Sequence, residues 1–267
     1  MIPPHIETPF KRMGARVKVR HARGRLPVFT FGLDIERDAR GEHFSLLVPH
    51  GSRLEEYGID VIDVRPDLRH LLLLVRQENR KDKFLCGHDE RHWFTCAVPG
   101  PGVASVRTAM QALKPAEIRT LEDTLHLPGK HRLKRRNPAF VRQGEWFFVP
   151  APDLNVPAGL IRRNEPISRG RGKPHRLEEA YRSGGEAVWV SHRHPTGVTQ
   201  RQYEHLLDTH PKARSWGWRL MRRGASVYAR GRVSHGDHAT ITLSGWHRVL
   251  MNTEHEAPAA RNVVFLD

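Results

Sequence analysis

Residues 83–99 read KFLCGHDERHWFTCAVP, and this stretch sets the expectation for the fold. A straight strand rises about 3.3 Å per residue, so Cys86 and Cys96 would lie roughly 33 Å apart if the whole stretch were one strand. Residues 87–90 (GHDE) have the composition of a turn, which would instead bring the two ends side by side. The stretch therefore predicts a β-hairpin whose apolar face includes two buried cysteines.

The same stretch is the densest group of chemically active side chains in the sequence. Two cysteines, two histidines and two acids fall within eleven residues. Cys86, His88, His92 and Cys96 form a C-x-H-x3-H-x3-C pattern, and Cys2His2 is a common ligand set for zinc, although a zinc finger has a longer loop between its two pairs. A hairpin with ordinarily hydrogen-bonded histidines is the main interpretation. The alternatives are a metal site and a non-metal active site that uses His88, Asp89 or His92.

Segments on both sides of this hairpin predict further strands and a few short helices. Alternating or continuously apolar runs, which are typical of strands, occupy residues 26–33, 42–48, 59–64, 69–77, 144–150, 186–191, 216–220, 227–233, 241–243 and 263–266. Helical spacing occupies residues 103–113, 116–125 and 200–209. Thr199 and Gln202 would form a capping box at the start of the last helix. We therefore expect an α+β fold of mostly antiparallel β-sheet with a few short helices.

Two breaks rich in Pro and Gly, at residues 99–102 and 150–157, predict a division of the chain. We place the boundary near residue 126. Residues 1–126 would form a sheet-plus-helix subdomain with a basic N-terminal arm, and residues 127–267 a basic β-rich subdomain. In the arm, residues 16–20 (RVKVR) alternate like a strand with one charged face. Such a segment would either lie over phosphates or form an edge strand kept soluble by its charge.

The net charge of +15 is the strongest global signal in the sequence. The 267 residues include 44 Lys and Arg against 29 Asp and Glu. A positive field of this size attracts polyanions, chiefly nucleic acid, and Arg in particular binds phosphate and stacks on bases. A GC-rich genome would explain the preference for Arg over Lys, but it would not explain the excess of bases over acids.

Membrane insertion and secretion are not indicated by the sequence. The longest apolar run, residues 71–75, is too short to span a membrane. The N-terminal residues lack the apolar core of a signal peptide, and two cysteines in an intracellular chain are more often free thiols than a disulfide. We expect a soluble, cytoplasmic protein with no membrane partner.

A basic surface is predicted in the second half of the chain. Residues 130–182 contain thirteen Lys and Arg but five Asp and Glu. Basic residues beside aromatic ones suit single-stranded nucleic acid, because the charges contact the backbone and the rings stack on bases. The candidate nucleic-acid-binding residues are Lys130, Arg132, Lys134, Arg135, Arg136, Trp146, Arg162, Arg163, Arg169, Arg171 and Lys173. A phosphate-binding loop at Lys173 is excluded, because the G-x4-G-K-[ST] spacing is absent.

The sequence SHGDH at residues 234–238 is the best catalytic candidate. His235, Asp237 and His238 fall in a short turn between two predicted strands, and His247 lies on the strand that follows. Histidines with a carboxylate suffice to bind zinc or another divalent metal, and a His–Asp pair would equally act as a general base in phosphodiester cleavage. A polar turn in which Asp237 bonds its own backbone is the alternative. His175 is an isolated candidate ligand or base, but because it stands alone in the sequence we expect a surface histidine.

Three classes of function fit these observations. The first is a non-catalytic nucleic-acid-binding protein, for single-stranded or structured RNA or DNA, such as a subunit of a ribonucleoprotein or a mobile-element complex. The second is a metal-dependent nuclease or other phosphodiesterase that uses the 235–247 cluster, with a divalent metal such as zinc as cofactor. The third is a structural module that binds acidic protein surfaces, so protein partners stay open. We rank them in this order, with a small gap between the first two, because a basic protein acting on nucleic acid would show the same charge.

Overall fold

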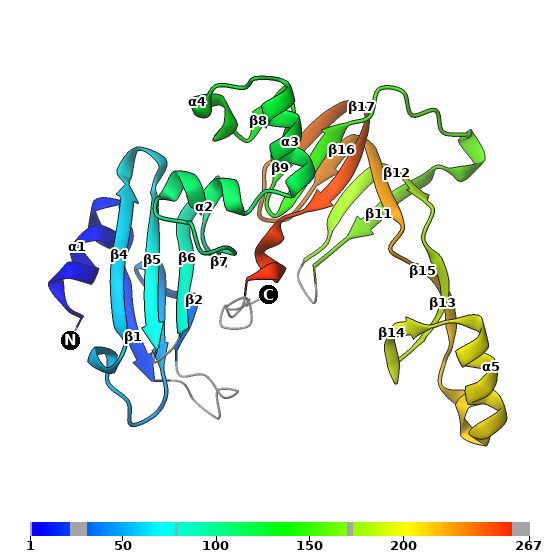
Figure 1. Cartoon of the computed structure of the whole chain (residues 1–267), viewed down its shortest axis with the longest axis horizontal. Coiled ribbons are helices and arrows are strands. Elements are labelled where there is room, and N and C mark those ends of the chain that lie inside the picture. Colours follow the sequence, from blue (N-terminus) through cyan, green and yellow to red (C-terminus); the bar gives the residue numbers. More distant parts are fainter. Residues whose placement is uncertain (1, 22–30, 78–79, 170–172, 258–267) are drawn as a thin grey trace.

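The computed structural model describes residues 2–21, 31–77, 80–169 and 173–257. Over these residues the chain forms four β-sheets linked by short helices (Figure 1). The strand pairs are antiparallel, except for the parallel pair of β1 (Val17–His21) with β3 (Gly41–Val48). The expected α+β fold of mostly antiparallel sheet with short helices is confirmed. No helix in the described part of the chain is long and apolar enough to cross a membrane.

Two sheets pack face to face in the first half of the chain. One has the order β1-β3-β2 and the other the order β4-β5-β6-β7. The further bounds are β2 (Gly32–Asp38), β4 (Gly58–Arg65), β5 (His70–Gln77), β6 (Arg80–Asp89), β7 (His92–Ala97) and the helix α1 (Pro4–Arg12), with short 3₁₀ turns η1 (Leu54–Glu56) and η2 (Pro66–Leu68). Phe44 of β3 and Leu73 of β5 meet in the core between the sheets, to which α1 adds Phe10.

The apolar run at residues 71–75 is buried because β5 is covered on both faces. Leu71 and Leu73 point into the core between the two sheets. Leu72 points the other way, where α2 (Val106–Ala112) packs over the sheet with Val106 and Ala109. A strand with two covered faces needs apolar side chains at every position rather than at alternate ones, which explains the continuous apolar run in this predicted strand.

The N-terminal segment is folded rather than an arm over phosphates. It forms α1 and then β1, which is an edge strand of its sheet. Its charged face is neutralised within the sheet: Arg16 and Lys18 lie 2.7 and 2.6 Å from the carboxylate of Asp38, and Arg20 pairs with Glu36. Of the two alternatives for residues 16–20, the structure has the charged edge strand.

The second half of the chain is organised around a seven-stranded sheet with the order β11-β12-β16-β17-β10-β9-β8. Its strands are β8 (Arg136–Asn137), β9 (Phe140–Gln143), β10 (Trp146–Pro150), β11 (Arg162–Ile167), β12 (His175–Ser183), β16 (Ser226–Ser234) and β17 (Ile241–Met251), and η3 (Ala158–Leu160) precedes β11. On one face Phe148 packs with Leu177 and Val249. On the other face Phe147 packs beneath Ile118 of α3 (Ala116–Thr124). The predicted strand at residues 144–150 therefore has two apolar faces.

A buried ion pair holds the helical connection between the two halves. Lys114 follows α2, and its Nζ lies 2.6 Å from Oε1 of Glu122 in α3. The same ammonium donates to the carbonyl of Arg132 at 2.6 Å, which fixes the short helix α4 (Gly129–Arg132). Lys114 is 4% exposed and Glu122 is fully buried, so the pair replaces the water that both charges would otherwise need.

The boundary near residue 126 stays a prediction. Two sheets lie before it in the sequence and two after it, but α3 precedes residue 126 and packs against β9 and β10 of the second half. The 3₁₀ turn η5 (Thr253–Glu256) also ties the halves together, because Glu254 accepts a hydrogen bond from the amide of Ala97 at 3.0 Å and pairs with Arg169 at 2.5 Å. Glu254 is only 1% exposed.

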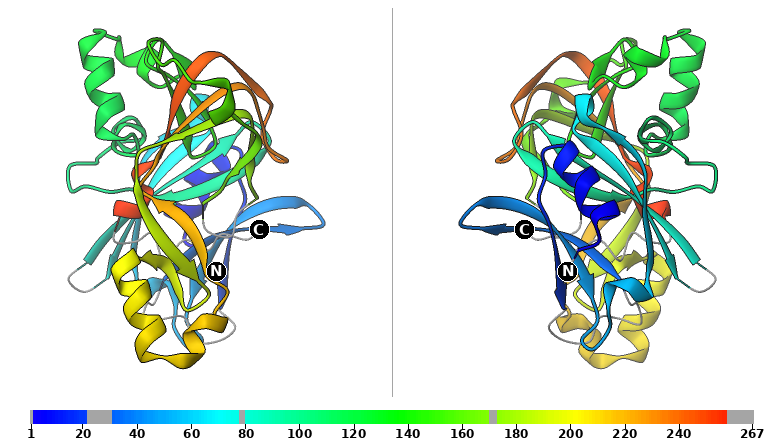
Figure 2. Two further views of the ribbon diagram at one scale, coloured as in Figure 1. Left: turned by 90° about the vertical axis from the view of Figure 1, so that its right-hand side faces the viewer. Right: turned by 90° about the vertical axis from the view of Figure 1, so that its left-hand side faces the viewer.

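Residues 186–223, called the insertion below, form a separate small structure. It consists of β13 (Glu186–Ser191), β14 (His194–Val198), α5 (Gln200–Thr209), η4 (Pro211–Ser215) and β15 (Arg219–Arg223). It leaves the large sheet after Ser183 of β12 and returns at Ser226 of β16, and these two residues are paired across the sheet. Figure 1 shows the insertion projecting away from the rest of the chain, and in both views of Figure 2 its yellow helix α5 lies at the lower end of the picture.

The buried ring of His70 makes stability depend on pH. Burial lowers its pKa to about 4, although a contact with the carbonyl of Leu68 acts in the opposite direction. The folded chain therefore keeps His70 neutral above about pH 4, whereas the unfolded chain protonates it below about pH 6.5. Its contribution to stability is complete above pH 6.5 and is lost progressively as the pH falls toward 4, with about 2 kcal/mol lost between pH 7 and pH 5.

We expect His70→Gln to reduce the loss of unfolding free energy between pH 7 and pH 5 by about 2 kcal/mol. Urea unfolding at the two pH values measures the difference. Replacing an exposed histidine, His126→Gln, is the control and is expected to leave the loss unchanged. An equal loss in wild type and in the His70 variant would contradict the assignment.

Candidate metal site

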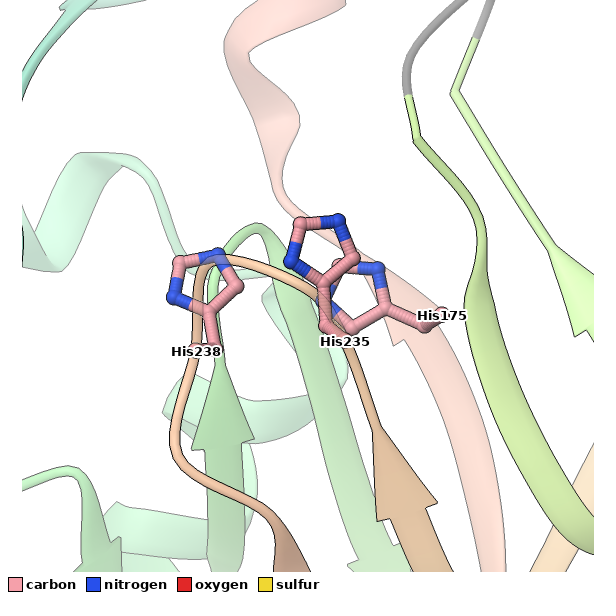
Figure 3. Close-up of side chains that lie close together, drawn as sticks. All are labelled: His175, His235 and His238. Atoms are coloured by element: carbon pink, nitrogen blue, oxygen red, sulfur yellow. The ribbon is translucent and has the colours of Figure 1, made fainter.

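Three histidine side chains from separate parts of the second half converge at one end of the large sheet (Figure 3). His175 is the first residue of β12, His235 follows β16 directly, and His238 lies in the turn before β17. The ring centroids of His175 and His235 are 4.2 Å apart, and His238 lies 4.8 Å from His235 and 5.6 Å from His175. One ligating nitrogen from each ring lies within 4.8 Å of the other two.

The pairing of β12 with β16 explains this convergence. Arg176 pairs with Ser234 in the antiparallel register. The residue before the first and the residue after the second, His175 and His235, therefore lie opposite each other at the end of the ladder. The turn at residues 235–240 then folds back toward β17 and brings His238 to the same place.

The burial of His175 indicates a missing ligand. The residue is 1% exposed, and within the described residues neither of its ring nitrogens has a hydrogen-bond partner. Nδ1 of His238 is also buried without a partner there. Buried polar atoms are nearly always hydrogen-bonded, because leaving one unpaired costs about 1–3 kcal/mol. A metal ion bound by these nitrogens would remove that cost.

The electrostatic state of the cluster suits a metal. Burial, with added repulsion from His235 and His238, lowers the pKa of His175 to about 3. Burial also lowers the pKa of His238, although Asp89 acts to raise it. Both rings are therefore neutral at pH 7, which is the form of imidazole that binds a metal.

His235 is the one member of the cluster that is held by the backbone. Its Nδ1 accepts a hydrogen bond from the amide of Asp237 at 3.1 Å, and its Nε2 lies 3.2 Å from the carbonyl of Lys173. These contacts fix the ring beside His175. Binding a metal through His235 requires one of the two contacts to be exchanged for the ion.

The cluster opens into a cavity of about 760 Å³ between the two halves of the chain. The first half contributes Glu42, Asp89 and His92 to its wall. The lining cations are Arg37, Lys114, Arg132, Lys134, Arg142, Arg169 and Lys173, and the lining carboxylates are Glu42, Asp89, Glu145, Asp237 and Glu254. The wall thus has more cations than carboxylates beside the neutral histidines, and the cavity has room for an anionic ligand.

A carboxylate lies beside the histidines. Asp237 pairs with Lys173 at 3.1 Å. Partial burial acts to raise the pKa of Asp237, but the hydrogen bond and charge of Lys173, together with His235 and His92, lower it overall. Asp237 is therefore ionised at neutral pH.

The tip of the β6–β7 hairpin is fastened to the histidine turn. Glu90, at the turn of the hairpin, accepts a hydrogen bond from the amide of Ala239 at 2.5 Å. Arg135 pairs with both Asp89 and Glu90, the latter at 2.6 Å. The hairpin predicted from residues 83–99 thus contributes to the site by its tip, not through its cysteines.

The predicted ligand set in that hairpin is not brought together. The set consists of Cys86, His88, His92 and Cys96. Cys86 lies in the core between the two sheets, whereas Cys96 lies on the opposite face beneath α2. His92 bonds Glu42 at 2.7 Å, and the His88 ring packs edge-on against Trp93. Opposite faces of one sheet cannot supply ligands to one ion, because side chains there point apart. Burial raises the pKa of the Cys86 thiol to about 12.

The predicted catalytic set of His235, Asp237, His238 and His247 is brought together only in part. His247 is not a member of the three-histidine cluster. It lies within β17, where it pairs with Ala229 and Pro150, and its Nδ1 is 2.8 Å from the carbonyl of Gly245. His175 takes its place and is buried, not the surface histidine expected from the sequence. The alternation of His175 with the buried Leu177 is the local signal for an inward-facing position.

The predicted nucleic-acid-binding residues fall into two groups. Arg132, Arg135, Arg169 and Lys173 are held in ion pairs with Asp123, Asp89 and Glu90, Glu254 and Asp237 respectively. Lys130, Lys134, Arg136, Arg162 and Arg163 are exposed. Arg171 lies outside the described residues. The exposed group belongs to α4, β8 and β11, at two separate edges of the large sheet.

Trp146 has a structural position. It is partly buried against the core of the large sheet, and its ring lies 6.4 Å from that of His175. Because Phe147 and Phe148 are buried as well, the aromatic run at residues 146–148 does not form an exposed platform for bases.

Comparison of the chain with protein-family models, with curated proteins and with solved structures finds no match.

Gly144 leaves the space that two of the histidines occupy. A Cβ at this position would lie 2.9 Å from Nε2 of His238 and 3.4 Å from Nε2 of His175, and its φ of +56° disfavours other residues. We expect Gly144→Ala to displace these rings and to weaken metal binding at least tenfold, measured by metal titration against a chromogenic chelator. Gly51→Ala also has a positive φ, of +89°, but open space around its Cβ, and serves as the matched control. Equal metal affinity in the two variants would contradict this role.

Proposed function

We propose that the chain is a metal-dependent phosphodiesterase acting on nucleic acid, with His175, His235 and His238 as the metal ligands. The observation that carries the proposal is the buried imidazole of His175, which has no hydrogen-bond partner in the described chain and faces two further histidines in a cation-lined cavity. Three histidines are a ligand set of catalytic zinc sites, which leave a further position for water or substrate.

The chemistry follows from this set of side chains. A divalent metal lowers the pKa of bound water to about 7 and polarises a phosphoryl oxygen. His175, His235 and His238 would hold the metal, and Asp237 would accept a proton from the attacking water. The water oxygen would bond to phosphorus as the bond between phosphorus and the leaving oxygen breaks, and that oxygen would take up a proton from solvent. Arg142 and Lys134, both in the cavity wall, would bind the non-reacting phosphate charge.

The net charge supports nucleic acid as the substrate class. The excess of 44 bases over 29 acids favours a polyanion. A non-catalytic nucleic-acid-binding protein is the second candidate, and one observation favours it: Lys130, Lys134 and Arg136 are exposed, and none of them has a salt bridge to a described acid. This group would bind a phosphate backbone with or without hydrolysis.

The test uses the full chain purified without a histidine tag. Elemental analysis measures bound metal, and labelled single-stranded and duplex oligonucleotides measure hydrolysis with and without chelator. About one metal per chain, with hydrolysis that chelator removes and added zinc or manganese restores, would support the enzyme. Bound metal with no hydrolysis of any oligonucleotide would overturn the enzyme and leave the binding protein. No bound metal, even after incubation with zinc, would overturn the metal site itself.

A further inference from the structure

The insertion at residues 186–223 carries an aromatic cluster that lies apart from the metal site. Trp189 and Tyr203 are stacked, with centroids 4.3 Å apart and planes at 14°. Tyr203 meets Trp218 edge-on at 5.1 Å, and Trp218 lies 5.9 Å from Trp216. His194 adds a ring stacked on Trp218 at 5.4 Å and 12°. The rings therefore form a continuous row along the insertion.

These rings are not hidden in a core. Each of Trp189, Tyr203, Trp216 and Trp218 is partly exposed. Among the described residues of the insertion, the buried ones are Val188, Ser191, Gly197 and Ala213. A structure of this size cannot cover four large rings with its own side chains, so the row both holds the insertion together and presents ring surface to the outside.

The surface around the row is basic. The insertion contains seven Lys and Arg (Arg193, Arg201, Lys212, Arg214, Arg219, Arg222 and Arg223) against Glu186, Glu204 and Asp208. The guanidinium of Arg193 lies over the ring of Trp216 at 4.9 Å. Arg214 and Arg219 flank the same tryptophans in sequence and are exposed. On β15, Leu220 and Met221 are 61% and 53% exposed, which adds apolar surface between the cations.

We propose that the insertion binds single-stranded nucleic acid by stacking bases on its aromatic row while its cations contact the backbone. Exposed rings beside cations are the two components that such binding needs, because every base has a flat face and every nucleotide carries a negative charge. In a duplex the bases are paired and stacked on one another, so their flat faces are not available to the rings. An acidic protein partner would use the cations, but it does not carry a flat ring beside every negative charge as a nucleic acid does.

The position of the insertion would let it select substrates for the proposed enzyme, a role that rests on the proposed function. His175 begins β12 and Ser183 ends it. The nine residues of this strand separate the insertion from the metal site by about 26 Å. A strand held on the insertion would thus reach the metal site only if it were several nucleotides long, so the insertion would select long single strands over short ones.

The binding test uses the full chain and a fluorescein-labelled 20-nucleotide oligothymidylate, with a duplex of equal length for comparison. We expect the single strand to bind more tightly than the duplex and to quench tryptophan fluorescence. Trp216→Leu is expected to weaken binding of the single strand about tenfold or more, and Trp216→Phe to retain most of it. Far-ultraviolet circular dichroism checks that both variants fold.

A charge variant keeps the test valid if Trp216→Leu unfolds the insertion. Arg214→Ala with Arg219→Ala leaves every ring in place and is expected to weaken binding and reduce its salt dependence. Arg40→Ala with Arg53→Ala, two exposed arginines of the first half, is the matched control. Equal affinity of wild type and both insertion variants for the single strand would overturn the proposal, as would tighter binding of the duplex.

Two readouts separate this proposal from the proposed enzyme. A His175→Ala variant that has lost its metal is expected to bind the oligothymidylate as wild type does. Hydrolysis of bis(p-nitrophenyl) phosphate, which is too small to reach the insertion, is expected to be unchanged by Trp216→Leu. If the insertion variants bind the single strand more weakly but no preparation hydrolyses it, the binding role of the insertion is supported and the proposed enzyme is not. If Trp216→Leu and the variant Arg214→Ala with Arg219→Ala both hydrolyse long single strands as wild type does, the role of the insertion is overturned. The proposed enzyme would then still stand.

Discussion

His175→Ala is expected to remove the bound metal and to lower phosphodiester hydrolysis by more than about 100-fold. Loss of a residue that merely orients a metal ligand typically weakens metal binding or activity 10- to 100-fold, so loss of a ligand itself should exceed that range. His175 is the most deeply buried of the three histidines, and no other described side chain bonds its ring nitrogens. Elemental analysis and oligonucleotide hydrolysis measure the two effects on the same preparation.

The control for this variant is His205→Ala, which removes an exposed histidine of α5. It is expected to keep both metal and activity. Thermal unfolding separates loss of the ligand from loss of the fold: without metal, His175→Ala removes an unpaired buried ring and is expected to change stability far less than it changes metal affinity. Full metal occupancy in His175→Ala would show that the cluster is not the site.

Lys114→Met is expected to destabilise the fold by about 3–5 kcal/mol. Removing one partner of a buried ion pair leaves the other charge uncompensated away from water, and that charge accounts for most of the loss. Glu122 is fully buried and would keep a 3.3 Å contact from Asn137 after Lys114 is gone. Burial lowers the pKa of Lys114, and the nearby Glu122 offsets part of this effect by favouring the charged ammonium. Urea unfolding at pH 7 measures the change.

A double variant tests the cause of this loss. Lys114→Met with Glu122→Leu removes both charges and is expected to recover most of the stability, because apolar side chains of similar volume replace buried ion pairs well. Arg65→Met breaks an exposed pair with Asp67 and is the control, with little change expected. A double variant as unstable as the sum of its two single variants would show that packing, not charge, causes the loss.

Local signals in the sequence predicted the elements that depend on neighbours along the chain. The helix at residues 200–209 has the predicted bounds, because Thr199 caps it and Gln202 completes the capping box within one turn. The strand at residues 186–191 also has the predicted bounds. The strand expected at residues 216–220 begins later, at Arg219, because Trp216 ends the turn η4. The strands expected at residues 26–33 and 263–266 lie wholly or partly outside the described residues.

Features that depend on distant pairing were not predicted. The strand β12 was missed because its alternation is interrupted by a bulge between Leu177 and Glu179 and by exposed charges. Without the pairing of β12, the contact between His175 and His235 could not be predicted, because His235 lies 60 residues further along the sequence, beyond the insertion. Cys86 and Cys96 are both buried as expected, but they lie on opposite faces of the sheet instead of one apolar face. The alternative of a joint metal site fails for the same reason, because register cannot be read from spacing alone.

The bond between Glu254 and the amide of Ala97 has a consequence for the timing of folding. It joins residues 157 positions apart, and the cavity wall draws on segments from Ile35 to Glu254. On a ribosome, chains grow at about 5–20 residues per second and fold from the N-terminus onward. The sheets of the first half have all their strands early, but the cavity cannot close until Glu254 has left the exit tunnel. A nascent chain would therefore lack the complete cavity wall until Glu254 has emerged and bonded Ala97.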